Sequence, residues 1–189
     1  MRVVAGEARG RRLVAPAGHD TRPTLDRVRE AVFNSLASLD AVGGARVLDL
    51  YAGSGALGIE ALSRGAAHAT FVDSDRAARQ AVEQNLASTG LADRADIVSA
   101  EAAPHLRRLA TSGVAPFDLV LLDPPYGTDD AAWLDLLDLV PPVAPSAVVV
   151  AESDREVPVP DGWHALRVKR YGGTLVSVLM PPSPPPEPS

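Results

Sequence analysis

The feature that most constrains the fold is a regular alternation of strand-like apolar runs with segments of helical periodicity. Seven apolar runs indicate strands, at residues 46–52, 69–73, 96–100, 117–123, 147–153, 164–171 and 174–180. Amphipathic segments before and between them indicate helices, at residues 25–39, 57–65, 74–89, 104–111 and 131–140. This order predicts an α/β fold with a doubly wound, mostly parallel, seven-stranded sheet. A Gly-Gly pair joins the last two runs and predicts an antiparallel hairpin at one edge.

Length and composition indicate one domain with one sizeable core. The chain has 189 residues, of which 46% are hydrophobic, and a typical domain has about 100–200 residues. It contains no cysteine, which excludes disulfides and thiolate metal sites. No segment approaches the roughly 18 consecutive apolar residues of a membrane span. We therefore expect a cytoplasmic protein without a membrane partner.

The charge is unevenly distributed along the chain. The formal net charge is −6, yet residues 1–29 contain seven arginines and three acids, a local charge of +4 that leaves −10 for the remainder. These patterns predict two parts of the chain. Residues 1–40 form a basic N-terminal extension that includes the first helix, and residues 41–181 form the main domain. Residues 182–189, PSPPPEPS, are expected to form a disordered proline-rich tail.

The first strand-to-helix loop carries a G-x-G-x-x-G pattern formed by Gly53, Gly55 and Gly58. Ligands of doubly wound sheets bind at the carboxyl ends of the strands. Dinucleotide-binding enzymes share the pattern, so an NAD(P)-dependent oxidoreductase is an alternative. Asp49 argues against it, because a carboxylate beside the helix N-terminus would repel a pyrophosphate. The same carboxylate would attract the ammonium and sulfonium groups of S-adenosylmethionine, which we therefore expect as the cofactor.

Two further acids follow the next two strands. Asp73 lies twenty residues after Gly53, where it could accept hydrogen bonds from ribose hydroxyls. Glu101 could face the adenine amino group, with the Ala102 N–H nearby, although each acid alone could equally be a loop residue. Asp75 is expected to cap the following helix. The predicted cofactor site comprises Asp49, Tyr51, Gly53, Gly55, Asp73, Glu101 and Ala102.

A second motif, LLDPPYG, ends the fourth strand with Asp123, Pro124, Pro125 and Tyr126. A plain β-turn would explain the prolines and glycine, but not an acid and an aromatic ring at the ligand-binding edge. The motif resembles the D/N-P-P-Y/F signature of methyltransferases that modify an exocyclic amino group of a base. There the Asp123 side chain and the Pro124 carbonyl would accept the two amino hydrogens. Pro125 fixes where that carbonyl points, and Tyr126 offers a ring for stacking a flipped base, so no metal is needed.

Longer stretches make the resemblance more specific. MRVVAGEARGRRL, TRPTLDRVREAVFN, LDLYAGSGALGIEALSRGA, LLDPPYG and KRYGGTLV together resemble the RsmD family, over about residues 1–180. The resemblance implies a class I, Rossmann-like methyltransferase domain that uses S-adenosylmethionine to methylate the N2 amino group of a guanine in 16S ribosomal RNA. Adenine-N6 methyltransferases of DNA or RNA share DPPY and are an alternative, although the DNA enzymes generally need an added target-recognition region. A non-catalytic RNA-binding factor that retains this fold is a further alternative.

The resemblance also gives the basic extension a role and a partner. We expect contacts to RNA phosphates from Arg9, Arg11, Arg12, Arg22 and Arg27. Arg29 could join them or pair instead with an acidic neighbour, and solvated surface charge without a partner is the alternative for all of them. The expected partner is 16S ribosomal RNA or the small ribosomal subunit, assembling or mature, and the chain is expected to be a monomer. The four histidines lack ligand spacing, so no metal site is expected.

Overall fold

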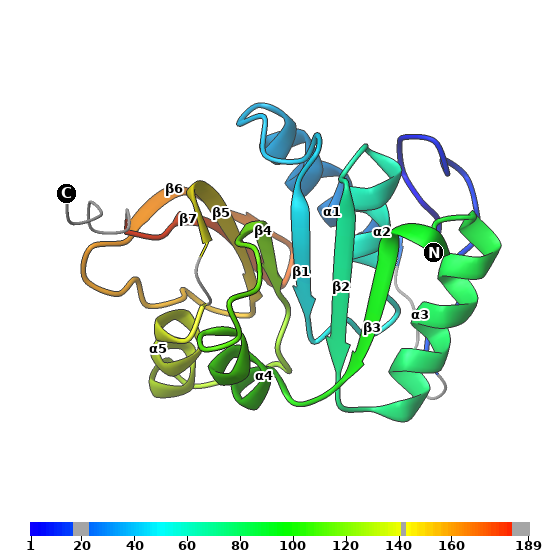
Figure 1. The fold of residues 1–189 in the computed structure, drawn as a ribbon. Coiled ribbons are helices and arrows are strands. Elements are labelled where there is room, and N and C mark those ends of the chain that lie inside the picture. Colours follow the sequence, from blue (N-terminus) through cyan, green and yellow to red (C-terminus); the bar gives the residue numbers. More distant parts are fainter. Residues whose placement is uncertain (17–22, 141–142, 183–189) are drawn as a thin grey trace.

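The computed structural model describes residues 1–16, 23–140 and 143–182 (Figure 1). The strands are β1 (Arg46–Leu50), β2 (His68–Asp73), β3 (Ala95–Ser99), β4 (Phe117–Leu122), β5 (Val143–Ser153), β6 (His164–Tyr171) and β7 (Thr174–Met180). The helices are α1 (Pro23–Ala37), α2 (Ala56–Ser63), α3 (Arg76–Thr89), α4 (Ala102–Leu109) and α5 (Asp130–Asp138), with a short 3₁₀ turn, η1, at Ala92–Arg94.

The strands form one seven-stranded sheet in the order β3-β2-β1-β4-β5-β7-β6. The four pairs among β1 to β5 are parallel, whereas β7 runs antiparallel to both β5 and β6. The predicted mostly parallel sheet with an antiparallel edge hairpin is therefore confirmed. The chain winds outward from β1 to β3 and then returns to β4 on the other side of β1. This reversal places the switch point, where such sheets bind ligands, at the carboxyl ends of β1 and β4.

Helices cover both faces of the sheet, which explains why the central strands are apolar at nearly every position. In β4, Leu119 and Leu121 pack in the core shared with α1, α2 and α3. Val120 and Leu122 pack in the second core, shared with α4 and α5. Side chains alternate along a strand, so Asp123 continues the row of Leu119 and Leu121 toward the side of α1 and α2.

The N-terminal segment belongs to the first of these cores. Val3, Ala8 and Leu13 are buried in it, as are Val32 and Phe33 of α1. Backbone hydrogen bonds fold residues 1–16 back on themselves, including Val3 N–H to the Arg11 carbonyl at 3.0 Å. The described parts of the N-terminal segment, residues 1–16, and of α1 thus share a core with the sheet, and the RNA-facing role of residues 1–40 stays a prediction.

Two remaining features concern the predicted tail and the membrane. Of the tail, residues 183–189 lie outside the described residues. Within the described ranges, every helix is too short or too polar to cross a bilayer.

Candidate active site

Asp49 forms the floor of a pocket beneath the glycine loop. Its side chain is 1% exposed, and its Oδ2 accepts a hydrogen bond from Gly58 N–H at 2.9 Å, in the first turn of α2. A Cβ at Gly58 would lie 2.9 Å from that oxygen and 2.4 Å from the Phe71 ring, so only glycine permits this contact. Gly55, with φ 74°, begins α2 in the left-handed region that favours glycine.

Burial raises the pKa of Asp49 to about 8. The Gly58 hydrogen bond opposes this rise, while the negative charges of Asp123 and Asp73 add to it. A cation bound beside the carboxyl would lower that pKa and so stabilise the charged form. The predicted role of Asp49 toward a cationic ligand stays a prediction.

Asp73 supports the other side of the loop. Its Oδ2 accepts from Gly53 N–H and its Oδ1 from Asp75 N–H, both at 2.9 Å. Asp75 caps α3 as expected, because its Oδ1 accepts from Ala78 N–H at 2.7 Å. Each Asp73 oxygen has a further lone pair that a hydroxyl could use.

Most of the predicted cofactor residues line two adjoining cavities. Asp49 and Gly53 border the first, of about 140 Å³, together with Ala52, which was not predicted, and Asp73, Glu101 and Ala102 border the second. Gly55 borders neither of these two cavities. Tyr51 borders both; it has φ 61°, unusual for a bulky residue, and burial followed by the charge of Glu101 raises its pKa.

The DPPY motif meets the first cavity from β4. Asp123 is an exposed residue that borders this cavity, and the exclusion of water from around its carboxyl raises its pKa to about 6. The Pro125 carbonyl is engaged by Thr128, which donates from its N–H at 3.3 Å and its Oγ1 at 2.7 Å. Within the described residues, no donor reaches the carbonyl of Pro124, a buried residue, so its role as an acceptor for a ligand stays a prediction.

Tyr126 is 63% exposed, as a stacking platform needs to be. Its hydroxyl forms a hydrogen bond with the Thr174 Oγ1 at 3.0 Å, at the start of β7. This hydrogen bond between the motif and the edge hairpin was not predicted from the sequence. The hydroxyl therefore holds the exposed ring in place.

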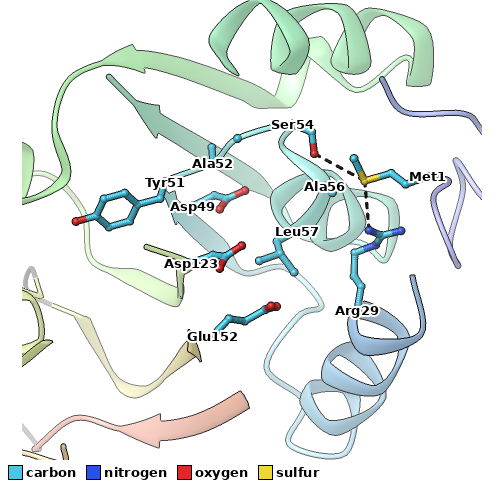
Figure 2. A pocket seen from close by; sticks show the side chains of 11 residues that line it. Met1, Arg29, Asp49, Tyr51, Ala52, Ser54, Ala56, Leu57, Asp123 and Glu152 are labelled. Atoms are coloured by element: carbon cyan, nitrogen blue, oxygen red, sulfur yellow. Dashed lines mark hydrogen bonds between the residues drawn. The ribbon is translucent and has the colours of Figure 1, made fainter. Parts of the chain in front are cut away.

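Glu152 completes a group of three carboxylates, and sequence reasoning missed it. Figure 2 shows Asp49, Asp123 and Glu152 one above the other along the same cavity. Glu152 is 7% exposed. Burial, followed by the negative charge of Asp123, raises the pKa of Glu152 to about 8, whereas the positive charge of Arg29 opposes this rise. The sequence carried part of the signal, because Val148, Val150 and Glu152 alternate along β5 as Leu119, Leu121 and Asp123 do along β4; the pairing of the two strands is the part that only the structure shows.

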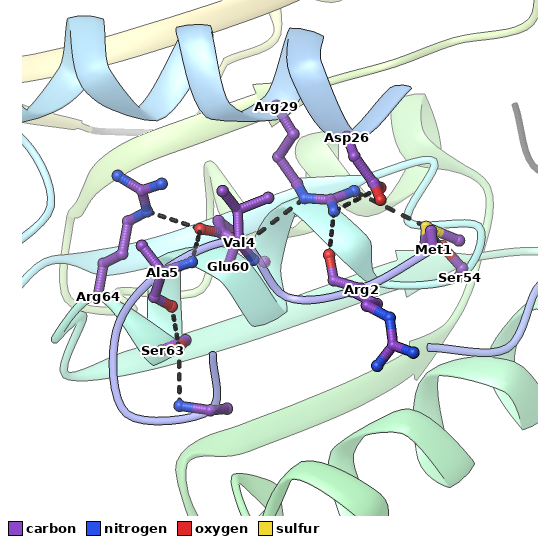
Figure 3. A network of polar contacts seen from close by, with 12 residues as sticks. Met1, Arg2, Val4, Ala5, Asp26, Arg29, Ser54, Glu60, Ser63 and Arg64 are labelled. Carbon is purple, nitrogen blue, oxygen red and sulfur yellow. Dashed lines mark hydrogen bonds and ion pairs between the residues drawn. The ribbon is translucent and has the colours of Figure 1, made fainter. Parts of the chain in front are cut away.

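Arg29 borders the cavity from α1 but is already paired (Figure 3). Its Nη2 lies 2.8 Å from Asp26 Oδ1, and its Nε lies 3.5 Å from Glu60 Oε2. Nη2 also donates a hydrogen bond to the Arg2 carbonyl. Of the two roles considered for Arg29, pairing with an acidic neighbour is the one that the structure shows. At 3% exposure it is not a surface contact for RNA.

Glu60 joins the N-terminal segment to the helices around the cavity (Figure 3). It is fully buried and accepts from Val4 N–H at 2.8 Å, Ala5 N–H at 3.0 Å and Arg64 Nε at 2.7 Å. Met1 also borders the cavity, so this network determines one of its walls.

Of the five arginines predicted to contact RNA, four lie in the part of the chain that the structure describes. Arg9, Arg11, Arg12 and Arg27 are exposed, and none forms an ion pair with a described residue. Arg22 lies outside the described residues. Contacts with RNA stay a prediction for all five. Among the described residues, no group of three or more His, Asp or Glu side chains is arranged to hold a metal ion.

Comparison with known proteins assigns the chain to a family. The profile of a protein family described as Conserved hypothetical protein 95 matches residues 1–180. YlbH of Bacillus subtilis is 42% identical over 184 residues, which cover 94% of this chain and 97% of YlbH. Ribosomal RNA small subunit methyltransferase D of Escherichia coli K12 is 41% identical over 185 residues, 91% of this chain and 85% of that protein. The chain belongs to this family, the RsmD family.

Structural comparison agrees with the assignment. The solved structure of Escherichia coli yhhF matches this RsmD-family chain with a TM-score of 0.81 at 37% identity, covering 97% of this chain and 99% of yhhF. The predicted Rossmann-like, class I methyltransferase fold is thus confirmed. The family match spans the N-terminal segment, both cavities and the β6–β7 hairpin, so the whole site lies within it.

Proposed function

We propose that this member of the RsmD family is a ribosomal RNA methyltransferase that transfers a methyl group from S-adenosylmethionine to the N2 amino group of a guanine in 16S ribosomal RNA. One observation carries the proposal. Asp123 borders the same cavity as the buried Asp49, and no described residue donates a hydrogen bond to the carbonyl of the next residue, Pro124. A site for a cationic methyl donor therefore adjoins two acceptors suited to an amino group.

The residues of both cavities fit S-adenosylmethionine, which when bound supplies an electrophilic methyl group. Asp49 would balance the positive charge of the methionine portion beside Gly53. Asp73 and Glu101, in the second cavity, would accept hydrogen bonds from the ribose and the adenine. An oxidoreductase is disfavoured, because the buried Asp49 carboxylate would face a pyrophosphate at the start of α2.

Asp123 and Pro124 would act by orienting the nucleophile. The lone pair of an aromatic amino nitrogen is delocalised into the ring, so the nitrogen attacks poorly. Two acceptors that hold its hydrogens favour a geometry in which the lone pair points at the methyl group. The Thr128 contacts occupy the next carbonyl along, that of Pro125, which favours the Pro124 carbonyl as the second acceptor. Positioning of two bound reactants can supply about 7–11 kcal/mol of the barrier reduction.

The proposal is tested with purified components. The protein is incubated with labelled S-adenosylmethionine and small subunits or 16S RNA from cells that lack it, and the RNA is digested and analysed by mass spectrometry. We expect label in N2-methylguanosine. Label in N6-methyladenosine would support the adenine alternative, and calorimetric binding of NADH but not of S-adenosylhomocysteine would support an oxidoreductase.

A further inference from the structure

The register of the sheet brings Glu152 next to Asp123. Leu122 of β4 pairs with Ala151 of β5 in parallel, so Asp123 and Glu152 are the next residues along adjacent strands. Both continue rows whose preceding members, Leu121 and Val150, lie in the core on the α1 and α2 side. Their carboxyls therefore meet the cavity from the same face of the sheet, as Figure 2 shows.

Glu152 has no partner that would explain its position. It is 7% exposed, and no described residue donates a hydrogen bond to its carboxylate. The nearby guanidinium of Arg29 is held by Asp26 and Glu60 instead. Glu152 borders the cavity, and its oxygens are not among the described polar atoms that are fully buried without a partner, so its unpaired acceptors face the cavity. Polar groups that are largely buried are normally hydrogen-bonded, which indicates that a donor on a ligand completes the site.

A guanine held by its amino group would present such a donor. On the guanine ring, N1–H adjoins the carbon that carries the N2 amino group. With the two amino hydrogens directed to Asp123 and Pro124, N1–H is the next donor along that edge, and Glu152 is the next acceptor along the sheet. We infer that Glu152 accepts the N1–H of the target guanine and so selects guanine over bases that lack this hydrogen. The inference rests on the proposed function.

The selection follows from the chemistry of the ring position. Adenine and 2-aminopurine carry a lone pair at N1, which would face the carboxylate oxygen and leave both acceptors unpaired. The charged groups around Glu152 are Asp49, Asp123 and Arg29. A bound sulfonium and ammonium would add positive charge to the cavity, which favours the ionised carboxylate. In that form Glu152 can only accept hydrogen bonds.

The test uses substrate RNA in which the modified guanine is replaced by 2-aminopurine, which keeps the N2 amino group but has no N1–H. We expect wild-type kcat/KM to be at least about ten-fold lower with 2-aminopurine than with guanine. In Glu152→Gln the amide can donate to the N1 lone pair or accept from N1–H. The guanine to 2-aminopurine ratio should therefore fall several-fold, with guanine still methylated. Glu156→Gln, an exposed neighbour, is the matched control and should keep the wild-type ratio.

A wild-type ratio near one would overturn the inference without any variant. The inference would also be contradicted if Glu152→Gln kept the wild-type ratio, or if that variant bound S-adenosylhomocysteine normally yet methylated neither RNA. If wild-type protein fails to methylate the guanine substrate at all, the proposed function itself fails, which is a distinguishable result.

Discussion

At the scale of single residues, Asp123 is proposed to accept a hydrogen bond rather than to carry charge. Asp123→Asn should keep measurable activity, because an amide oxygen still accepts from the guanine amino group. Asp123→Ala should lower the single-turnover rate by about 100-fold or more, as when a group positioned for the transition state is deleted. If Asn proves as inactive as Ala in these rates, the carboxylate must instead take a proton.

Tyr126 combines an exposed ring with an anchored hydroxyl. Tyr126→Ala should be severe, because it removes the surface on which a base would stack, worth about 1–3 kcal/mol. Tyr126→Phe keeps the ring but loses the hydrogen bond to Thr174, so a loss of a few-fold is expected. Thr174→Val should match it in single-turnover rate. Equal losses for Phe and Ala would show that the hydroxyl, not the ring, matters.

Glu152 should make stability depend on pH. Its pKa of about 8 in the folded state exceeds the ordinary value of 4.5, so the folded state binds more protons and stability falls as pH rises through this interval. Glu152→Gln should therefore gain stability over wild type between about pH 5 and pH 8, and keep the gain above that. Urea unfolding across pH measures the difference, which should vanish near pH 4. A pH-independent difference would contradict the burial of this charge.

At the scale of elements, the Glu60 network holds the N-terminal segment against α1 and α2. Glu60→Ala leaves Arg29 and the Val4 and Ala5 amides without their buried acceptor. Loss of one partner of a buried charge cluster costs about 3–5 kcal/mol. S-adenosylhomocysteine affinity should fall as well, because Arg29 and Met1 border the cavity. Glu83→Ala, on the exposed side of α3, should change neither quantity in unfolding or calorimetry.

The exposed arginines of the N-terminal segment can be tested only without removing the segment. Deleting it would take Val3, Ala8 and Leu13 out of the core, so a loss of activity would not isolate the charges. The triple change Arg9→Ala, Arg11→Ala and Arg12→Ala should weaken RNA binding and reduce the salt slope by about 3, with S-adenosylhomocysteine affinity unchanged. Arg107→Ala on α4 is the surface control. An unaltered salt slope would mark the three arginines as ordinary surface charge.

At the scale of the whole molecule, local periodicity predicted all seven strands and the edge hairpin. In the central strands β1 and β4 the apolar pattern follows from burial on both faces, whereas β3 and β6, at the two edges of the sheet, are largely exposed. The carboxylates of Asp49 and Asp123 were predictable, since each is accompanied by glycines or prolines that mark a ligand loop. Glu152 was not, because its proximity to Asp123 depends on the pairing of β4 with β5, which no local pattern encodes. The same holds for Val4 and Ala5, whose amides meet Glu60 only through the tertiary fold.

The central claim is that this chain methylates the N2 amino group of a guanine in 16S ribosomal RNA. The most direct measurement maps modified nucleotides by mass spectrometry in ribosomal RNA from cells that lack the chain, contain it, or contain Asp123→Ala. We predict one N2-methylguanosine in 16S RNA that is present with the wild-type chain and missing from the other two. The same set of modifications in all three cell types, or a difference confined to methyladenosine, would contradict the claim.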